Sequence, residues 1–202
     1  MPRRRRYDLA KRAFDVTVAV AALPVLLLVL LICAIAIKLD SPGPVMFHQP
    51  RTGRNGRRFG MFKLRTMVRN AEQLKAELAH LNVLPAPDFK IPDDPRVTRV
   101  GKILRKTSLD EAPQLLNVLR GDMSIVGPRP TSFAPSTYEL WHTQRLEVRP
   151  GITGLWQVEG RGSTTFDERL RLDVRYIRNQ SLLQDLLLVL RTFGSVVRRP
   201  GT

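Results

Sequence analysis

Two adjacent carboxylates stand out in a strongly cationic chain. Asp110 and Glu111 lie in the segment Thr107-Ser-Leu-Asp-Glu-Ala-Pro-Gln114, just after the cations Arg105 and Lys106. Nearby positive charge favours the ionised form of a carboxylate, and an ionised aspartate can attack phosphorus to form an aspartyl-phosphate type of intermediate. The adjacent carboxylate can hold Mg²⁺, which neutralises phosphate charge and assists the leaving group. The pair therefore indicates phosphoryl transfer.

The same segment also has a purely structural interpretation. Ser108 followed three residues later by Glu111 is the pattern of a capping box at the start of a helix, and acidic residues in a first turn suit the helix dipole. On residue pattern alone, capping is the commoner use of such a pair. Adjacent residues on a helix point about 100° apart, so the two carboxylates would have different roles and would not share one proton.

Other common catalytic motifs are absent from the sequence. There is no Walker A pattern, no G-x-S-x-G elbow and no dinucleotide-binding glycine fingerprint. His48, His80 and His142 are far apart, which argues against a zinc site. The single cysteine, Cys33, excludes an intramolecular disulfide framework.

The charge balance indicates an anionic partner. The 202 residues include 33 Lys and Arg against 18 Asp and Glu, a formal net charge of +15. Such a surplus suits nucleic acid, a phosphate-rich substrate or anionic lipid. Aromatic residues make up only 6% of the chain, which is few for stacking on single-stranded nucleic acid, so we expect no nucleic-acid partner.

A membrane segment precedes the carboxylates. The 22 residues from Val16 to Ile37 carry no charge, and as a helix they would be about 33 Å long, enough to cross a hydrocarbon core. Cations flank both ends, and cationic flanks normally stay in the cytoplasm. Pro24 lies inside the segment and favours a kink. The residues alone leave two arrangements open, a re-entrant helix that returns to the same face and a simple spanning helix.

Hydrophobic periodicity predicts the elements that surround the carboxylates. Strands at 45–48 and 59–65 around the turn 53–56 would form a β-hairpin, and a proline-rich loop would cover 84–95. A helix at 70–82 would carry Ala71, Leu74, Leu78 and Leu81 on one face, and a second helical region at 103–119 would be interrupted near Thr107–Ser108. A leucine-lined helix at 182–193 would face either the core or a bilayer surface.

Matches to one known family run through nearly the whole chain in order. The matching stretches are Lys11-Arg-Ala-Phe-Asp15, Ser41-Pro-Gly-Pro-Val45, Lys63-Leu-Arg-Thr-Met67, Asp94-Pro-Arg-Val-Thr98, Arg105, Ser108-Leu-Asp-Glu-Ala-Pro-Gln114, Asn117-Val-Leu-Arg-Gly121, Met123-Ser-Ile-Val-Gly-Pro-Arg-Pro130, Arg149-Pro-Gly-Ile-Thr-Gly-Leu-Trp-Gln157, Asp173-Val-Arg-Tyr-Ile177 and Asp185 to Thr192. With these stretches the chain resembles the bacterial sugar transferases, monotopic phosphoglycosyl transferases that act on polyprenyl phosphate.

The resemblance implies a two-step reaction at the carboxylate pair. The family's Asp-Glu dyad falls on Asp110 and Glu111, which would also meet Mg²⁺. Asp110 would attack the sugar-bearing phosphate of a UDP-sugar and release UMP, and undecaprenyl phosphate would then take the phosphosugar. By motif match, Arg105 and Arg129 would contact phosphate or nucleotide, and Lys63 and Arg65 are further candidates for this role. The stretch 154–158 is similar to members specific for glucose or galactose.

The resemblance also implies the architecture and location. We expect an α/β fold that is mainly helical with a small β-hairpin, with a re-entrant membrane helix kinked at Pro24 and with amphipathic surface helices. Residues 1–38 would form the basic N-terminus and membrane helix, and residues 39–202 the catalytic domain. The expected location is the bacterial inner (cytoplasmic) membrane with the catalytic domain on its cytoplasmic face. The implied partners are the UDP-sugar, undecaprenyl phosphate and membrane lipid, and a second copy of the chain is a further candidate.

Two other classes of function compete with this interpretation. A non-enzymatic membrane scaffold would use its basic face to hold anionic lipid or glycan, and it predicts that Asp110→Asn leaves function intact. A nucleic-acid-binding protein is suggested by the net charge alone, and it predicts tight duplex binding with a steep salt dependence. The sequence does not identify the sugar, the final glycan or the oligomeric state.

Overall fold

The described part of the chain folds into a mainly helical structure with two small β-sheets. A computed structural model describes residues 5–83, 89–132, 139–159 and 165–198, which exclude part of the expected basic run at 3–6 and part of the expected loop at 84–95. The helices are α1 (Arg5–Asp40), α2 (Gln73–Glu77), α3 (Arg99–Thr107), α4 (Gln114–Arg120), α5 (Leu155–Glu159), α6 (Phe166–Arg178) and α7 (Leu182–Arg198). The strands are β1 (Met46–Thr52), β2 (Arg58–Leu64), β3 (Ser124–Val126) and β4 (Gly151–Thr153).

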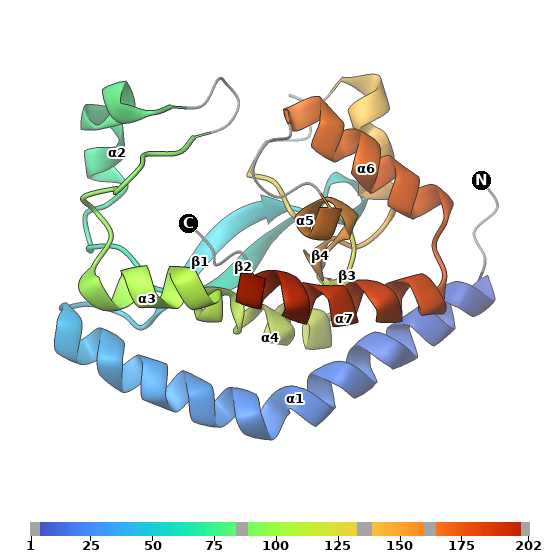
Figure 1. The fold of residues 1–202 in the computed structure, drawn as a ribbon, viewed down its shortest axis with the longest axis horizontal. Helices are drawn as coiled ribbons and strands as arrows, with labels where there is room; N and C mark the ends of the chain where they lie inside the picture. The colour runs from blue at the N-terminus through green and yellow to red at the C-terminus, as the bar shows by residue number, and fades with distance from the viewer. Residues whose placement is uncertain (1–4, 84–88, 133–138, 160–164, 199–202) are drawn as a thin grey trace.

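Helix α1 contains the whole uncharged segment and extends beyond it at both ends. Pro24 lies inside it, and Figure 1 shows the helix bent about its middle, with the rest of the described chain on one side of it. A proline removes one helix hydrogen bond and favours such a bend. Most of the large apolar side chains around the bend are exposed, among them Val25, Leu27, Leu28, Leu31, Ile32 and Ile35. Among the described residues, α1 is the one helix long and apolar enough to cross a membrane.

The predicted hairpin is confirmed, and its first strand is longer than expected. Strands β1 and β2 pair antiparallel from Met46 opposite Leu64 to Thr52 opposite Arg58. The turn between them contains a 3₁₀ segment in which Asn55 has a positive φ of 56°, a conformation that asparagine tolerates better than most residues. Strand β1 continues through Pro50. Pro50 lies at the edge of a two-stranded sheet, where the missing backbone N–H is tolerated.

A second sheet, which the sequence patterns did not predict, joins β3 and β4 in parallel. It depends on very close backbone approach, because a Cβ atom added to Gly151 would lie 2.1 Å from the nitrogen of Gly127. Only glycine allows two chain segments to come this near. The contact fixes the position of the segment Gly127 to Pro130 that follows β3.

The main core lies between α1, the hairpin and the C-terminal half of the chain. Its buried members include Ala19, Met61, Val118, Met123 and Leu188. The predicted helical region at 103–119 is confirmed as α3 and α4, separated near Ser108 as expected. The predicted helix at 70–82 is shorter, because only α2 and a 3₁₀ turn at Ala79–Leu81 form, and neither element buries a side chain.

The leucine stripe of α7 is not the side of the helix that packs against the rest of the protein. Leu183, Leu186 and Leu190 are exposed by 68%, 46% and 59%, whereas Asp185 and Leu188 are buried. Of the two orientations that the sequence left open, the structure therefore has the leucines on the outer surface. The inner side of α7 instead carries Leu188, which packs in the core, and Asp185, which makes several polar contacts.

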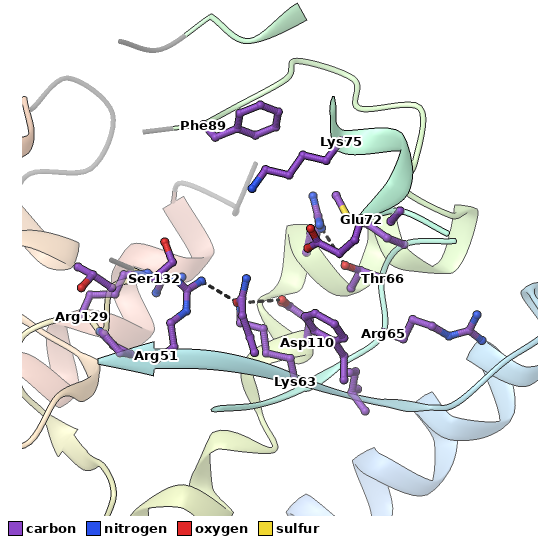
Figure 2. Close-up of a pocket in the computed structure, with 18 of the residues that line it drawn as sticks. Arg51, Lys63, Arg65, Thr66, Glu72, Lys75, Phe89, Asp110, Arg129 and Ser132 are labelled. Carbon is purple, nitrogen blue, oxygen red and sulfur yellow. Dashed lines mark hydrogen bonds and ion pairs between the residues drawn. The ribbon is translucent and has the colours of Figure 1, made fainter. Parts of the chain in front are cut away.

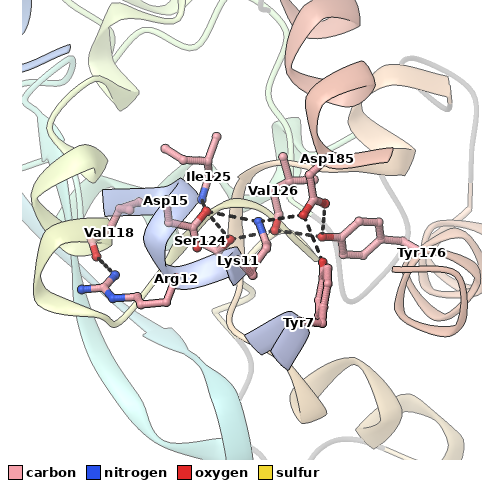
Figure 3. A network of polar contacts seen from close by, with 10 residues as sticks. All are labelled: Tyr7, Lys11, Arg12, Asp15, Val118, Ser124, Ile125, Val126, Tyr176 and Asp185. Atoms are coloured by element: carbon pink, nitrogen blue, oxygen red, sulfur yellow. Dashed lines mark hydrogen bonds and ion pairs between the residues drawn. The ribbon is translucent and has the colours of Figure 1, made fainter. Parts of the chain in front are cut away.

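Those contacts form a buried network which anchors the N-terminal part of α1 (Figure 3). The Lys11 Nζ atom lies 3.1 Å from Oδ1 of Asp15 and 3.3 Å from Oδ2 of Asp185. The hydroxyl groups of Tyr7 and Tyr176 donate to Asp185 at 3.0 and 2.7 Å. One lysine thus joins two buried carboxylates from opposite ends of the chain.

We expect Lys11→Met to destabilise the protein by about 3 kcal/mol, because it leaves two buried carboxylates without a cation. Thermal unfolding in one detergent measures the effect. Lys102→Met is the matched control, since Lys102 is exposed on α3. Equal losses in the two variants would show that the network contributes nothing to stability.

Candidate active site

The two carboxylates lie on a short 3₁₀ turn between α3 and α4. Ser108 ends α3 in the left-handed conformation, with φ 58° and ψ 16°, and Leu109–Glu111 then form the turn. The predicted capping box is wrong, because the Ser108 side chain makes no cap hydrogen bond. A left-handed residue does not have the extended backbone of an N-cap. The Ser108 carbonyl oxygen accepts the Glu111 N–H at 3.2 Å, and the Glu111 carboxylate is available for other partners.

Lys63 and Arg129 pair with the carboxylates. The Nζ atom of Lys63 lies 3.0 Å from Oε1 of Glu111 and 3.5 Å from Oδ2 of Asp110. Arg129 binds Glu111 through the two terminal guanidinium nitrogens. Nη1 lies 3.3 Å from Oε2, and Nη2 donates to Oε1. The carboxylates therefore differ, since Glu111 uses both oxygens in ion pairs and the Lys63 contact of Asp110 is longer.

The electrostatic surroundings shift the pKa values of the two carboxylates in opposite directions. Burial raises the pKa of Asp110 and the charge of Glu111 adds to this shift, while Lys63 and Arg105 oppose it. Burial by itself would also raise the pKa of Glu111, but the charges and hydrogen bonds of Arg129 and Lys63 outweigh burial and hold that pKa far below its ordinary value. Glu111 is thus a fixed anion, and Asp110 is a poorly solvated carboxyl group with greater affinity for a proton.

Two buried side chains, Asn117 and Arg145, hold the cations of the site in place through their hydrogen bonds. Asn117 on α4 accepts the Phe62 N–H and donates to the Gly60 carbonyl, both at 2.9 Å, which fixes β2 and its Lys63 against the carboxylate segment. Nη2 of Arg145 donates to the Arg129 carbonyl oxygen at 2.7 Å and to Asp173 at 2.7 Å.

The supporting pair of Arg145 and Asp173 was not predicted as part of the site. Burial raises the pKa of Asp173 to about 7, against the charges of Arg145 and Arg169. The two partners are 28 residues apart, so no local pattern marks them, although Asp173 begins one of the family-like stretches. Their contact shows that α6 supports the backbone of Arg129.

The other two predicted cations occupy different positions. Nε of Arg105 donates to the Thr66 hydroxyl at 3.0 Å, and its charge acts on Asp110. The guanidinium group of Arg65 donates to the carbonyl oxygens of Ser41 and Pro42 at 2.8 and 2.6 Å, and Figure 2 shows it pointing away from Asp110. In this structure Arg65 therefore holds the loop that joins α1 to the hairpin.

A pocket of about 750 Å³ opens over Asp110. Among the described residues that line it, ten are cationic and two are acidic, a balance that suits a substrate with several negative charges. The cationic members are Arg51, Lys63, Arg65, Arg69, Lys75, Arg96, Arg105, Arg129, Arg145 and Arg169. In Figure 2 Lys75 and Phe89 lie across the pocket from Lys63 and Asp110. Phe166 and Trp156 line the pocket too, and the guanidinium of Arg169 stacks over both rings at 5.7 and 5.5 Å.

Comparison with known proteins identifies the chain's relatives. The family described as "Bacterial sugar transferase" matches residues 6–199. The chain is 45% identical over 199 residues to the "UDP-glucose:undecaprenyl-phosphate glucose-1-phosphate transferase" of Caulobacter vibrioides (strain ATCC 19089 / CIP 103742 / CB 15), covering 94% of this chain and 70% of that protein. It is 44% identical over 197 residues to the "Galactosyl transferase CpsE" of Streptococcus agalactiae serotype III (strain NEM316). It is 40% identical over 201 residues to the "Exopolysaccharide production protein ExoY" of Sinorhizobium fredii (strain NBRC 101917 / NGR234).

The relatives differ in length. The matches to the Streptococcus and Sinorhizobium proteins each cover 96% of this chain, but they cover 43% of the first protein and 88% of the second. The chain therefore spans less than half the length of some relatives and most of the length of others.

Proposed function

The chain belongs to the bacterial sugar transferase family, and we propose that it transfers a sugar 1-phosphate from a UDP-sugar to polyprenyl phosphate. The observation that carries this proposal is Asp110 in the lining of a cationic pocket, beside a neighbouring Glu111 that is bound to two cations. The names of the Caulobacter and Streptococcus relatives favour glucose or galactose as the sugar.

In the first step, Asp110 would act as the nucleophile. An Oδ atom of Asp110 forms a bond to the sugar-bearing phosphorus, the bond from that phosphorus to the UMP oxygen breaks, and UMP leaves with the electron pair. Burial of Asp110 removes solvent from the attacking oxygen, and Lys63 is close enough to hold the carboxylate in position. Lys63, Arg105 and Arg129 supply the positive charge that phosphoryl transfer needs.

In the second step, an oxygen of the polyprenyl phosphate attacks the same phosphorus. The bond between phosphorus and Asp110 breaks, and the carboxylate is regenerated. A phosphate monoester is largely a dianion at neutral pH because its second pKa is about 6, so this attack requires no general base. The product is a polyprenyl diphosphate sugar, the first membrane intermediate of a polysaccharide or glycoconjugate.

Asp110 and Glu111 are the residues that would hold Mg²⁺. Within the described residues no group of three or more His, Cys, Asp or Glu side chains is placed to bind a metal ion. Mg²⁺ commonly takes one or two carboxylates together with substrate phosphates. Asp110, with a single 3.5 Å contact to Lys63, fits this role, and Glu111 would join it by exchanging a contact with Lys63 or Arg129. When bound, the ion would neutralise charge on the diphosphate.

The proposal places the protein at the inner (cytoplasmic) membrane with both ends of α1 on the cytoplasmic side. The bend near Pro24 and the exposed apolar side chains of α1 support a re-entrant helix, and the outward leucines of α7 support a surface position for that helix. Cysteine variants at positions 6 and 58 test the arrangement in oriented vesicles. We expect label to reach both positions from the same side, and labelling from opposite sides would overturn the re-entrant arrangement.

Release of UMP tests the proposed reaction directly. The protein is purified in detergent and incubated with Mg²⁺, undecaprenyl phosphate and a panel of UDP-sugars that includes UDP-glucose and UDP-galactose. We expect release with one of the sugars and formation of the matching lipid product. Folded protein that releases no UMP with any sugar in the panel would contradict the proposal.

A further inference from the structure

We propose that Phe47 binds the isoprenyl chain of the acceptor, next to the acceptor phosphate, at the membrane end of the active-site pocket. This inference rests on the proposed function, which requires a phosphate attached to a long apolar chain. It assigns the isoprenyl chain to one end of the pocket, and it gives Phe47 a role in binding the acceptor but not the donor.

The hairpin register places Phe47 beside the active-site lysine. Phe47 on β1 is directly opposite Lys63 on β2, and directly opposed residues of antiparallel strands project from the same face with their Cβ atoms about 5 Å apart. Lys63 contacts both Asp110 and Glu111. An aromatic ring therefore lies close to the point at which phosphorus is transferred.

The Phe47 side chain remains partly exposed within the active-site pocket, although β1 is paired with β2. Its side chain is 40% exposed, and it lines a pocket whose charged residues are almost all cations. The lining is less polar around it, where Pro44, Met46, Met67 and Val68 contribute. Large apolar side chains that remain exposed within a pocket commonly mark a site for an apolar part of a ligand.

This apolar end of the pocket is next to strand residues that pack against α1. Leu64 is buried in one cluster with Cys33 and Ile37 of α1, and Met46 packs against the same cluster. The opposite side of this part of α1 exposes Ile35 and Leu39. The strand ends beside Phe47 therefore pack against α1, so an acceptor held in the bilayer beside the exposed apolar side of α1 would meet this end of the pocket.

The two substrates differ in the feature that this end recognises. The diphosphate and sugar of the donor are polar, and the donor arrives from water, whereas the acceptor is a phosphate on a chain that stays in the bilayer. A phosphate placed near Lys63 and Asp110 would leave its first isoprene units beside Phe47. Electrostatic contacts would hold the phosphate, and burial of the ring and isoprene groups would hold the chain.

Two half-reactions separate the role of Phe47 from a general effect on the pocket. Incorporation of labelled UMP into UDP-sugar in the absence of acceptor measures the first step, and lipid-product formation against undecaprenyl phosphate concentration measures the second. We expect Phe47→Ala to raise the KM for undecaprenyl phosphate about tenfold, the effect of losing one well-buried ring contact, with UMP exchange within twofold of the wild type. Phe47→Leu should restore most of the acceptor affinity.

Phe89→Ala is the matched control, because Phe89 is 38% exposed and lines the same pocket. We expect the acceptor KM of Phe89→Ala to stay within twofold of the wild type. An unchanged acceptor KM in Phe47→Ala would overturn the inference, and so would an equal loss of both half-reactions, which would make Phe47 part of the donor site. Failure of the proposed function is distinguishable, since the wild type itself would then show no UMP exchange.

Discussion

Asp110→Asn is expected to lower turnover at least 10⁴-fold while leaving the fold intact. The amide has nearly the size of the carboxylate but cannot serve as the nucleophile toward phosphorus, and loss of a covalent nucleophile has effects of this order. The fold should survive, because Lys63 keeps its 3.0 Å ion pair with Glu111. Burial also raises the pKa of Asp110, so the charge that the substitution removes is costly to bury.

The measurement combines UMP release with detection of the covalent intermediate. Wild-type protein incubated with donor in the absence of acceptor should gain the mass of one phosphosugar on residue 110, and Asp110→Asn should gain none. Asp93→Asn is the control, since Asp93 is exposed and lies outside the pocket lining. Turnover within tenfold of the wild type in Asp110→Asn would remove Asp110 as the nucleophile.

Glu111→Gln is expected to slow turnover by about 10²- to 10³-fold. Glutamine keeps one acceptor oxygen but places an NH₂ group against Lys63 or Arg129, both of which now pair with the carboxylate. The stability should fall by about 2 kcal/mol, less than for a fully buried pair because Arg129 is partly exposed. Since Glu111 takes no part in a capping box, this loss cannot come from a helix cap.

The pH dependence of Glu111→Gln gives a second readout. The charge of Glu111 raises the pKa of Asp110, and Lys63 and Arg129 lower it. Removing the Glu111 charge leaves the cations to act on Asp110, so the pKa of Asp110 falls and the acid limb of kcat/KM moves to lower pH. Glu147→Gln, which changes an exposed glutamate, should leave the limb in place. Wild-type turnover with an unshifted limb would exclude Glu111 from the chemistry.

Several elements could be predicted because neighbours in the chain determine them. The glycine-containing turn at 53–56 and the flanking patterns predicted the hairpin, and the break near Ser108 separated α3 from α4 as expected. Helix 70–82 was overpredicted. Its apolar positions fit a helical face, but the structure gives them little to pack against, and α2 buries no side chain. Periodicity without packing partners was not enough to sustain the full helix here.

The orientation of α7 shows where local pattern is insufficient. Its leucine stripe allowed either the core or the surface, and no residue near it in the chain favours one of them. Lys11, Tyr7 and Tyr176 contact the buried Asp185, Leu188 packs in the core on the same side, and the leucines face outward. A contact between residues 11 and 185 depends on the path of the whole chain between them.

The sequence by itself determined the uncharged helix with its internal proline, the cationic surplus and the adjacent carboxylates, because each of these depends on residue type and short-range order. The tertiary structure decided which cations meet the carboxylates. It brought Lys63 from 48 residues away and Arg129 from 18 to Glu111, and it turned Arg65 toward a loop. Ion pairs between distant segments form only after packing has brought the segments together, so spacing in the sequence could nominate these cations but could not assign their partners.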